Sequence, residues 1–148
     1  MPQNLPSIFT AHCDVIKSVS SYKHLGFVLD VSPSFKLHIE QLVKKLRLRL
    51  GFYFRNKSCF SFAAKKRLVA ATFLPLIDYG DVLYQHASSQ CLKSLDTVYH
   101  GALRFRTNLK ALTHHCTLYE RVGWYSLNIN RLNHGYILIY QYTLGLLS

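Results

Sequence analysis

Acidic side chains are the first candidates for catalysis, because metal-dependent phosphoryl transfer uses carboxylates that bridge two divalent ions. The chain has seven acidic residues, and no two of them are adjacent. The closest pair is Asp78 and Asp81, which flank Tyr79 and Gly80 and follow Pro75. An internal proline interrupts a helix, so we expect these two carboxylates to serve a turn or a helix start instead of meeting at a metal. The sequence therefore predicts no catalytic carboxylate centre.

Histidine and cysteine offer two other metal candidates. The segment His12–Asp14 has the His-x-Asp spacing of an iron-binding facial triad, which His100 or His134 could complete. Iron triads of this kind lie in β-rich scaffolds, and the chain offers about two strands. Residues 114–116, with the distant Cys91, lack the paired close spacing of a zinc site. We therefore expect no metal, no other cofactor and no enzymatic activity.

Basic side chains give the strongest binding signal. Ten Lys and Arg residues lie between Lys36 and Arg67, and Glu40 is the single acid among them. Such a cluster repels itself, and phosphates relieve the repulsion while releasing their counterions. The predicted nucleic-acid-binding residues are Lys44, Lys45, Arg47, Arg55, Lys57, Lys65, Lys66 and Arg67. The alternative is an ordinary solvated helix face.

Within this basic region, the residues on either side of one short connection are the strongest candidates for nucleic-acid contact. Arg55 to Lys57 and Lys65 to Arg67 flank a short connection, residues 58–61, which brings two expected helix ends together. Charge at such a corner can bind one nucleic-acid backbone. Aromatic side chains lie among these cations, and they either stack on bases or pack in the core; core packing is the expected role. They are Phe52, Tyr53, Phe54 and Phe60.

Composition agrees with a polyanionic partner. The 148 residues carry a formal charge of +11 with a pI near 9.7, yet 49% are hydrophobic and the mean hydropathy is +0.07. A disordered basic tail would be less apolar, so we expect one folded domain. The four cysteines are scattered and no apolar stretch reaches about 20 residues, which predicts an intracellular chain, nuclear or cytoplasmic, without a membrane span. Anionic lipid would attract the same charges.

The hydrophobic pattern predicts a mainly α-helical fold. A short strand or hairpin is expected within about residues 14–30, with its longer strand at 22–30. A basic helix should then run to about residue 57, starting with Ser32 as N-cap and Pro33 in the first turn. One stripe of this helix is apolar and faces inward. Leu37, Leu48 and Phe52 fall roughly opposite that stripe, which indicates a second neighbour.

Further helices should complete a bundle of four to five. The spacing predicts a helix over residues 61–74, ended or kinked by Pro75, and a well-patterned helix over 88–106. A short helical turn over 118–122 should end at Gly123. The segment 127–147 is expected to form a last helix that is apolar nearly all round.

Several of these segments together resemble a known family. Tyr22 to Asp30, Leu76 to Asp81 and Leu118 to Trp124 carry the resemblance, which extends from about residue 14 to residue 147. They are similar to the region that follows the catalytic palm in reverse transcriptases of non-LTR (LINE-type) retrotransposons. The resemblance implies that residues 1–31 are a strand segment from the palm edge, and that residues 32–148 are a helical thumb that holds a primer–template duplex.

The chain departs from the family in what it lacks. The fingers and the palm carboxylates are absent from the sequence, so we expect a non-catalytic fragment of a retrotransposon RNA-directed DNA polymerase. RNA or DNA, as an RNA–DNA hybrid, is the expected partner, together with the missing palm domain. The alternative is a decayed open reading frame without an autonomous function. Oligomeric state is left open by the sequence.

Overall fold

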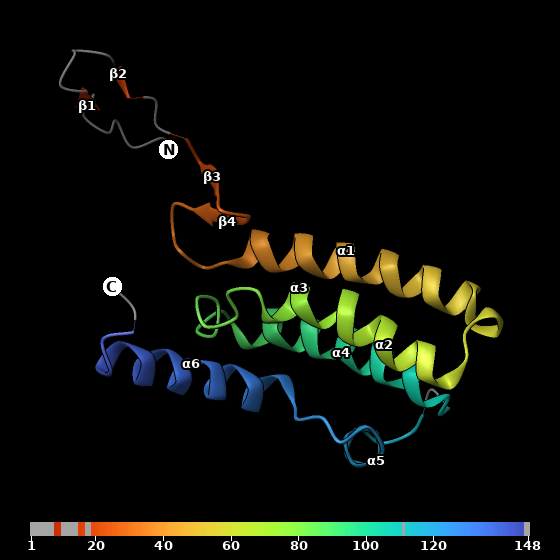
Figure 1. Ribbon diagram of the computed structural model, residues 1–148. Helices are drawn as coiled ribbons and strands as arrows, with labels where there is room; N and C mark the ends of the chain where they lie inside the picture. The colour runs from red at the N-terminus through yellow and green to blue at the C-terminus, as the bar shows by residue number, and fades with distance from the viewer. Residues whose placement is uncertain (1–7, 10–14, 17–18, 111, 147–148) are drawn as a thin grey trace.

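The computed structural model describes residues 8–9, 15–16, 19–110 and 112–146. It is mainly α-helical, with short antiparallel strands on the N-terminal side, which confirms the predicted fold class (Figure 1). Strands β1 (Ile8–Phe9) and β2 (Val15–Ile16) pair with each other. A second sheet, formed by the next two strands, is the one that meets the helices.

That second sheet is a β-hairpin where the sequence predicted one longer strand. Strand β3 (Ser21–His24) pairs with β4 (Phe27–Asp30), and Leu25 and Gly26 form the two-residue turn. Both turn residues have positive φ, 45° and 87°, as a type I′ hairpin requires. The leucine tolerates this uncommon conformation with support from the Tyr79 hydroxyl, which donates to the Leu25 carbonyl at 2.7 Å.

Helix α1 (Lys36–Arg55) is the longest element, and its start was predicted wrongly. Residues 32–33 lie outside the helix, and Phe35 takes the N-cap position with φ of 53°. The reason is local: Ser34 turns back to the carboxylate of Asp30, with its backbone N–H at 3.1 Å and its hydroxyl at 2.5 Å. This turn ends the hairpin and delays the helix.

The predicted inward stripe of α1 is confirmed. Its buried side chains are Ile39, Leu42, Val43, Leu46 and Tyr53. The outer side chains Leu37, Leu48 and Phe52 are 42, 69 and 51% exposed, so the second apolar side of α1 has no covering element among the described residues. Burying one such side chain against a partner would contribute about 1.5–3 kcal/mol to the stability of the complex. This side of α1 is therefore a candidate contact surface.

A short connection joins α1 to the next helix. A 3-10 turn, η1 (Lys57–Cys59), leads into α2 (Phe62–Thr72). Ser61 caps α2 by accepting a hydrogen bond from the Ala64 backbone N–H at 3.2 Å. Helix α2 ends before Pro75, as the sequence predicted.

Pro75 lies in the first turn of a new short helix, α3 (Leu74–Asp78), where its missing N–H costs nothing. After a turn-rich segment, α4 (Ser89–Thr107) follows with Ser88 as its N-cap. Its observed bounds agree with the predicted helix over residues 88–106. The asparagine that follows, Asn108, ends α4 in the left-handed conformation, with φ of 58°.

The last two helices are α5 (His115–Val122) and α6 (Leu127–Thr143). Gly123 ends α5 with φ of 67°, as predicted, although α5 begins earlier than residue 118. Ser126 caps α6, and Leu127 and Arg131 are its buried residues. The rest of α6 is largely exposed and apolar, as the sequence indicated.

The core lies between α1, α2, α4 and α5, with β4 closing one end (Figure 1). Phe105 of α4 is fully buried and stacks on Tyr53 of α1 with ring centroids 5.2 Å apart. Phe27 of the hairpin joins the same core beside Tyr79, at 5.2 Å. No helix among the described residues is long and apolar enough to cross a membrane, which agrees with the absence of a predicted span.

Candidate nucleic-acid interface

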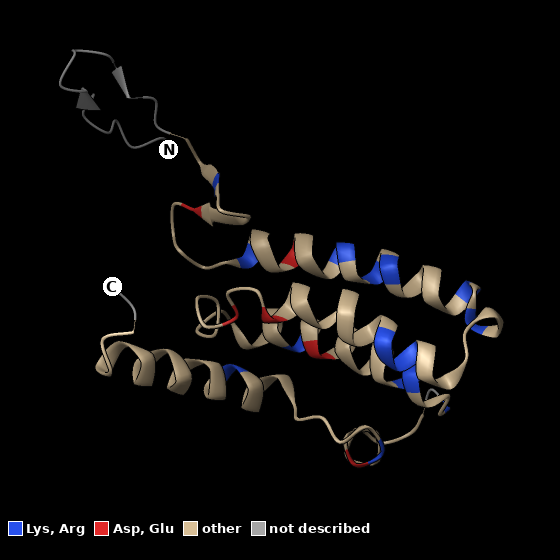
Figure 2. Ribbon diagram, viewed as in Figure 1, with Lys and Arg blue, Asp and Glu red and all other residues tan. Residues whose placement is uncertain are grey.

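The outer side of α1 carries the first group of predicted cations. Lys44, Lys45 and Arg47 are all exposed there. They share that side with the exposed Leu48, so the surface offers both charge and apolar area. Figure 2 shows basic segments along α1 and in α2 near the connection between the two helices.

The predicted corner exists as a hollow in the surface. An open cavity of about 460 Å³ lies where α1 ends, and its lining consists of Phe54, Arg55, Lys57, Ser58, Lys65 and Asn108. The fold therefore brings three of the predicted cations, from three different elements, to one depression. Exposed Lys66 and Arg67 continue the positive surface along α2, where Arg67 lines a neighbouring hollow of about 500 Å³.

Lys65 differs from the other predicted cations, because it is buried. Its side chain is 5% exposed, and its Nζ donates to Asn108 Oδ1 at 2.9 Å. The same ammonium lies 5.7 Å from the centre of the Phe105 ring, close enough for a cation–π interaction. Lys65 thus supports the wall of the hollow, and its contact with phosphate stays a prediction. A signal of this burial was available in the sequence, because Lys65 precedes buried Val69 by one helical turn.

The remaining corner cations have no acidic partners in the described part of the chain. The one ion pair found there joins His134 to Asp81, far from the corner in sequence. Cations without acidic partners repel one another, and phosphate oxygens would relieve that repulsion through charge-assisted hydrogen bonds.

The aromatic residues of the corner divide between the two expected roles. Tyr53 is 3% exposed and belongs to the core, as predicted. Phe54 and Phe60 lie edge-on against Phe105, at centroid distances of 5.7 and 6.2 Å. Phe54 nevertheless remains 43% exposed and Phe52 51%, so these two rings have area left for contact with bases or sugars.

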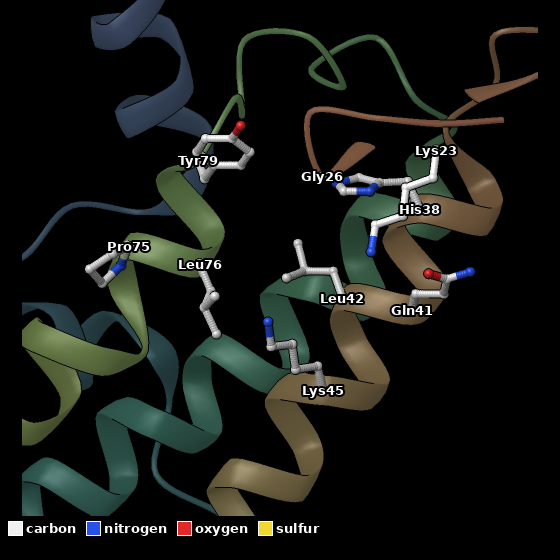
Figure 3. A pocket seen from close by; sticks show the side chains of 9 residues that line it. All are labelled: Lys23, Gly26, His38, Gln41, Leu42, Lys45, Pro75, Leu76 and Tyr79. Carbon is white, nitrogen blue, oxygen red and sulfur yellow. The ribbon is translucent and has the colours of Figure 1, made fainter. Parts of the chain in front are cut away.

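A second cavity adds a lysine that charge clustering did not reveal. About 530 Å³ of space lies between the hairpin, α1 and α3, and Lys23 and Lys45 both extend toward it (Figure 3). His38 also lines it, and burial lowers the pKa of this histidine. Lys23 lies far from α1 in sequence, so only the packing of the hairpin against α1 brings the two ammonium groups to one cavity.

An adjoining groove links this cavity to the corner end of α1. It has a volume of about 710 Å³, and Lys45, Arg49 and Phe52 are part of its wall. Arg49 is held in place by a hydrogen bond from its guanidinium to the Thr72 carbonyl. The positive surface thus follows the α1 side of the molecule from the hairpin toward the corner.

The metal candidates of the sequence have different outcomes. His12–Asp14 lie outside the described residues. His114, His115 and Cys116 lie within 4.8 Å of one another at an exposed helix start, without Cys91. Asp78 ends α3 and Asp81 lies in the turn that follows, which agrees with the turn role expected for these residues. The same turn also brings the two carboxylates and His134 within 4.8 Å of one another, a proximity that the sequence did not indicate.

Comparison with known proteins found no matching family model and no significant match to a curated protein or a solved structure.

Proposed function

We propose that the chain is a non-catalytic, thumb-like part of a retrotransposon RNA-directed DNA polymerase, and that it binds the backbone of an RNA–DNA primer–template duplex inside the cell. The observation that carries the proposal is the set of exposed cations along α1 and at the corner, which have no acidic partners among the described residues. The sequence resemblance supports the choice of duplex.

The shape of the surface suits a backbone instead of a single phosphate. Helix α1 has 20 residues and spans about 30 Å, so its cations are spread over a length that several successive phosphates occupy. Contacts of this kind position a duplex without reading its sequence. The half-exposed rings of Phe52 and Phe54 add stacking surface beside the cations.

The exposed apolar side of α1 fits the same proposal. Leu37 and Leu48 would contact the palm domain of the parent polymerase, which is the second partner that we propose. Without that domain, the apolar area faces water at a free-energy cost.

The test is a binding titration with a matched control. Fluorescence anisotropy of a labelled RNA–DNA hybrid hairpin is measured with the full chain and with two triple variants. The corner variant replaces Arg55, Lys66 and Arg67 by Gln. The control variant replaces Lys93, Lys110 and Arg121 by Gln, which are also exposed but lie outside α1 and outside the lining of the corner hollow. Both variants lose the same net charge, so only the position of the lost charge differs.

We expect the corner variant to bind at least about 10-fold more weakly than the wild type, and the control variant to change affinity by less than about 3-fold. Equal losses in both variants would show that net charge alone drives binding, which would contradict a defined interface. Saturable binding to anionic lipid vesicles with no binding to the hybrid would favour a membrane surface instead.

A decayed open reading frame without autonomous function remains the second candidate. The observation that favours it is the exposed apolar surface of α6, where Ile139, Tyr140 and Tyr142 are 61, 63 and 74% exposed. An orphaned fragment should aggregate and unfold without cooperativity, whereas a working module should unfold in one transition. Urea unfolding of the purified chain, followed by circular dichroism, separates the two.

A further inference from the structure

A partly buried polar cluster joins the turn after α3 to the middle of α6. Asp78 closes α3, Asp81 lies in the following turn, and His134 projects from α6. One ligand-type atom from each of the three side chains lies within 4.8 Å of the other two. His134 Nδ1 donates to Asp81 Oδ2 at 2.7 Å, across 53 residues of sequence.

The turn holds the two carboxylates in place. The Asp81 backbone N–H donates to the Asp78 carbonyl at 3.4 Å, and Gly80 between them has φ of 65°. A side chain at Gly80 would collide with the ring of Phe27, so the backbone of this turn packs directly against a core side chain.

The cluster is not satisfied by the protein groups around it. Asp81 is 2% exposed, and Asp78 Oδ1 is buried with no hydrogen-bond partner in the described part of the chain. Burial raises the pKa of Asp78, an effect that His134 opposes and Asp81 reinforces. A buried carboxylate oxygen without a partner costs about 1–3 kcal/mol or more, so this arrangement favours a cation that would occupy it.

Nearby positive charge does not fill this role. Arg131 is buried one helical turn before His134. Burial raises the pKa values of Asp96 and Tyr84, and the positive charge of Arg131 opposes that rise. The structure gives it no ion pair with Asp78 or Asp81. The two carboxylates therefore face His134 as their single nearby basic partner among the described residues.

From this juxtaposition we infer that Asp78, Asp81 and His134 form a binding site for a divalent transition-metal ion, best matched by Zn²⁺, which clamps α6 to the turn after α3. Two carboxylate oxygens and one imidazole nitrogen are a ligand set that zinc accepts. Ligand atoms about 2.1 Å from a tetrahedral ion lie about 3.4 Å apart, within the span from 2.7 Å to 4.8 Å found here.

Room for a further ligand is present. A cavity of about 520 Å³ opens beside the cluster, and Gln141 lies in its wall about two helical turns beyond His134. Water in this cavity would supply the fourth position. The ion would also explain what holds α6, because this helix buries only Leu127 and Arg131 against the rest of the molecule.

The test uses zinc itself and the full chain without a histidine tag. Isothermal titration measures the stoichiometry and affinity of Zn²⁺ for the wild type, Asp81→Asn and His134→Gln. A control variant carries His114→Gln, His115→Gln and Cys116→Ser, which removes the exposed cluster with similar spacing. Circular dichroism verifies that each variant is folded, and His134, with a side chain 38% exposed, is replaceable without loss of core packing.

We expect one zinc equivalent to survive in the control variant, and its affinity to fall at least about 100-fold in both Asp81→Asn and His134→Gln. That loss exceeds the roughly 10-fold to 100-fold typical when a residue merely orients a ligand. Zinc should also slow amide hydrogen exchange across residues 127–143 in the wild type and not in His134→Gln.

Three results would overturn the inference. They are a folded wild type that binds no zinc, binding that disappears in the control variant, and binding that persists in either Asp81→Asn or His134→Gln. Binding strengthened at low pH would contradict it too, because a metal must compete with protons for these ligands. None of these outcomes depends on nucleic-acid binding.

Discussion

Lys65 offers the sharpest test of the corner geometry, because two adjacent lysines are assigned opposite roles. Replacing Lys65 by Ala removes a charged hydrogen bond to Asn108, worth about 1.5–3 kcal/mol, and a cation–π contact with Phe105, worth about 0.5–1 kcal/mol. Relief of the buried ammonium's desolvation offsets part of this loss. We expect a net destabilisation of about 2 kcal/mol, or a Tm lower by roughly 8 °C for a chain of this size.

The matched control is Lys66→Ala, one residue along the same helix and exposed. Its unfolding free energy should stay within about 0.5 kcal/mol of the wild type, while its hybrid binding weakens. Urea unfolding gives both values. Equal stability of the two variants would refute the buried role of Lys65.

A double-mutant cycle refines the test. Asn108→Gly removes the acceptor while keeping the left-handed conformation at the end of α4. Combined with Lys65→Met, which retains the apolar stem, it should show a coupling of about 1 kcal/mol or more. Additivity of the two changes would mean that the hydrogen bond contributes nothing.

Three further predictions concern stability and surface. Gly80→Ala should destabilise the chain by about 2–4 kcal/mol, because the backbone there has positive φ and the new methyl group would collide with Phe27. Gly123→Ala has a similar φ but open space around it, so it should cost about 1 kcal/mol. Thermal unfolding of the two variants measures the difference. Burial lowers the pKa of His100, so the folded state resists protonation of this side chain. Relative to His100→Gln, the wild type should therefore lose unfolding free energy as pH falls below about 6.5. The same dependence of unfolding free energy on pH in both proteins would contradict the lowered pKa. The double variant Ile139→Gln, Tyr142→Gln should bind less of a hydrophobic dye than the wild type, because both side chains are exposed on α6. Its unfolding free energy should change by less than about 0.5 kcal/mol. Unchanged dye fluorescence would show that α6 does not present this apolar surface in solution.

Local signals explain most of what the sequence predicted correctly. Serine caps at positions 61, 88 and 126 and the proline at 75 mark helix boundaries through contacts within a few residues. The apolar stripe of α1 follows from spacing alone. The hairpin turn was missed because leucine rarely adopts positive φ, and Leu25 does so with help from distant Tyr79.

The arrangement of the basic corner and of the Asp81–His134 contact depends on packing that local sequence patterns do not reveal. The cations of α1 and of the corner were found because they are close in sequence, but the direction of Lys65 depends on the packing of α2 against α4. The meeting of Asp81 with His134 joins residues 53 positions apart, and it depends on the path of α6. Pairwise contacts of that separation leave no periodic pattern in a single sequence.

The salt dependence of hybrid binding tests the central claim most directly. On duplex nucleic acid, each phosphate contact contributes about 0.9 to the slope of log affinity against log salt concentration. We predict that Arg55→Gln, Lys66→Gln and Arg67→Gln together lower the magnitude of this slope by about 2–3, while the control triple at Lys93, Lys110 and Arg121 leaves it nearly unchanged. A slope that is the same in the wild type and the corner variant would contradict phosphate binding at the corner.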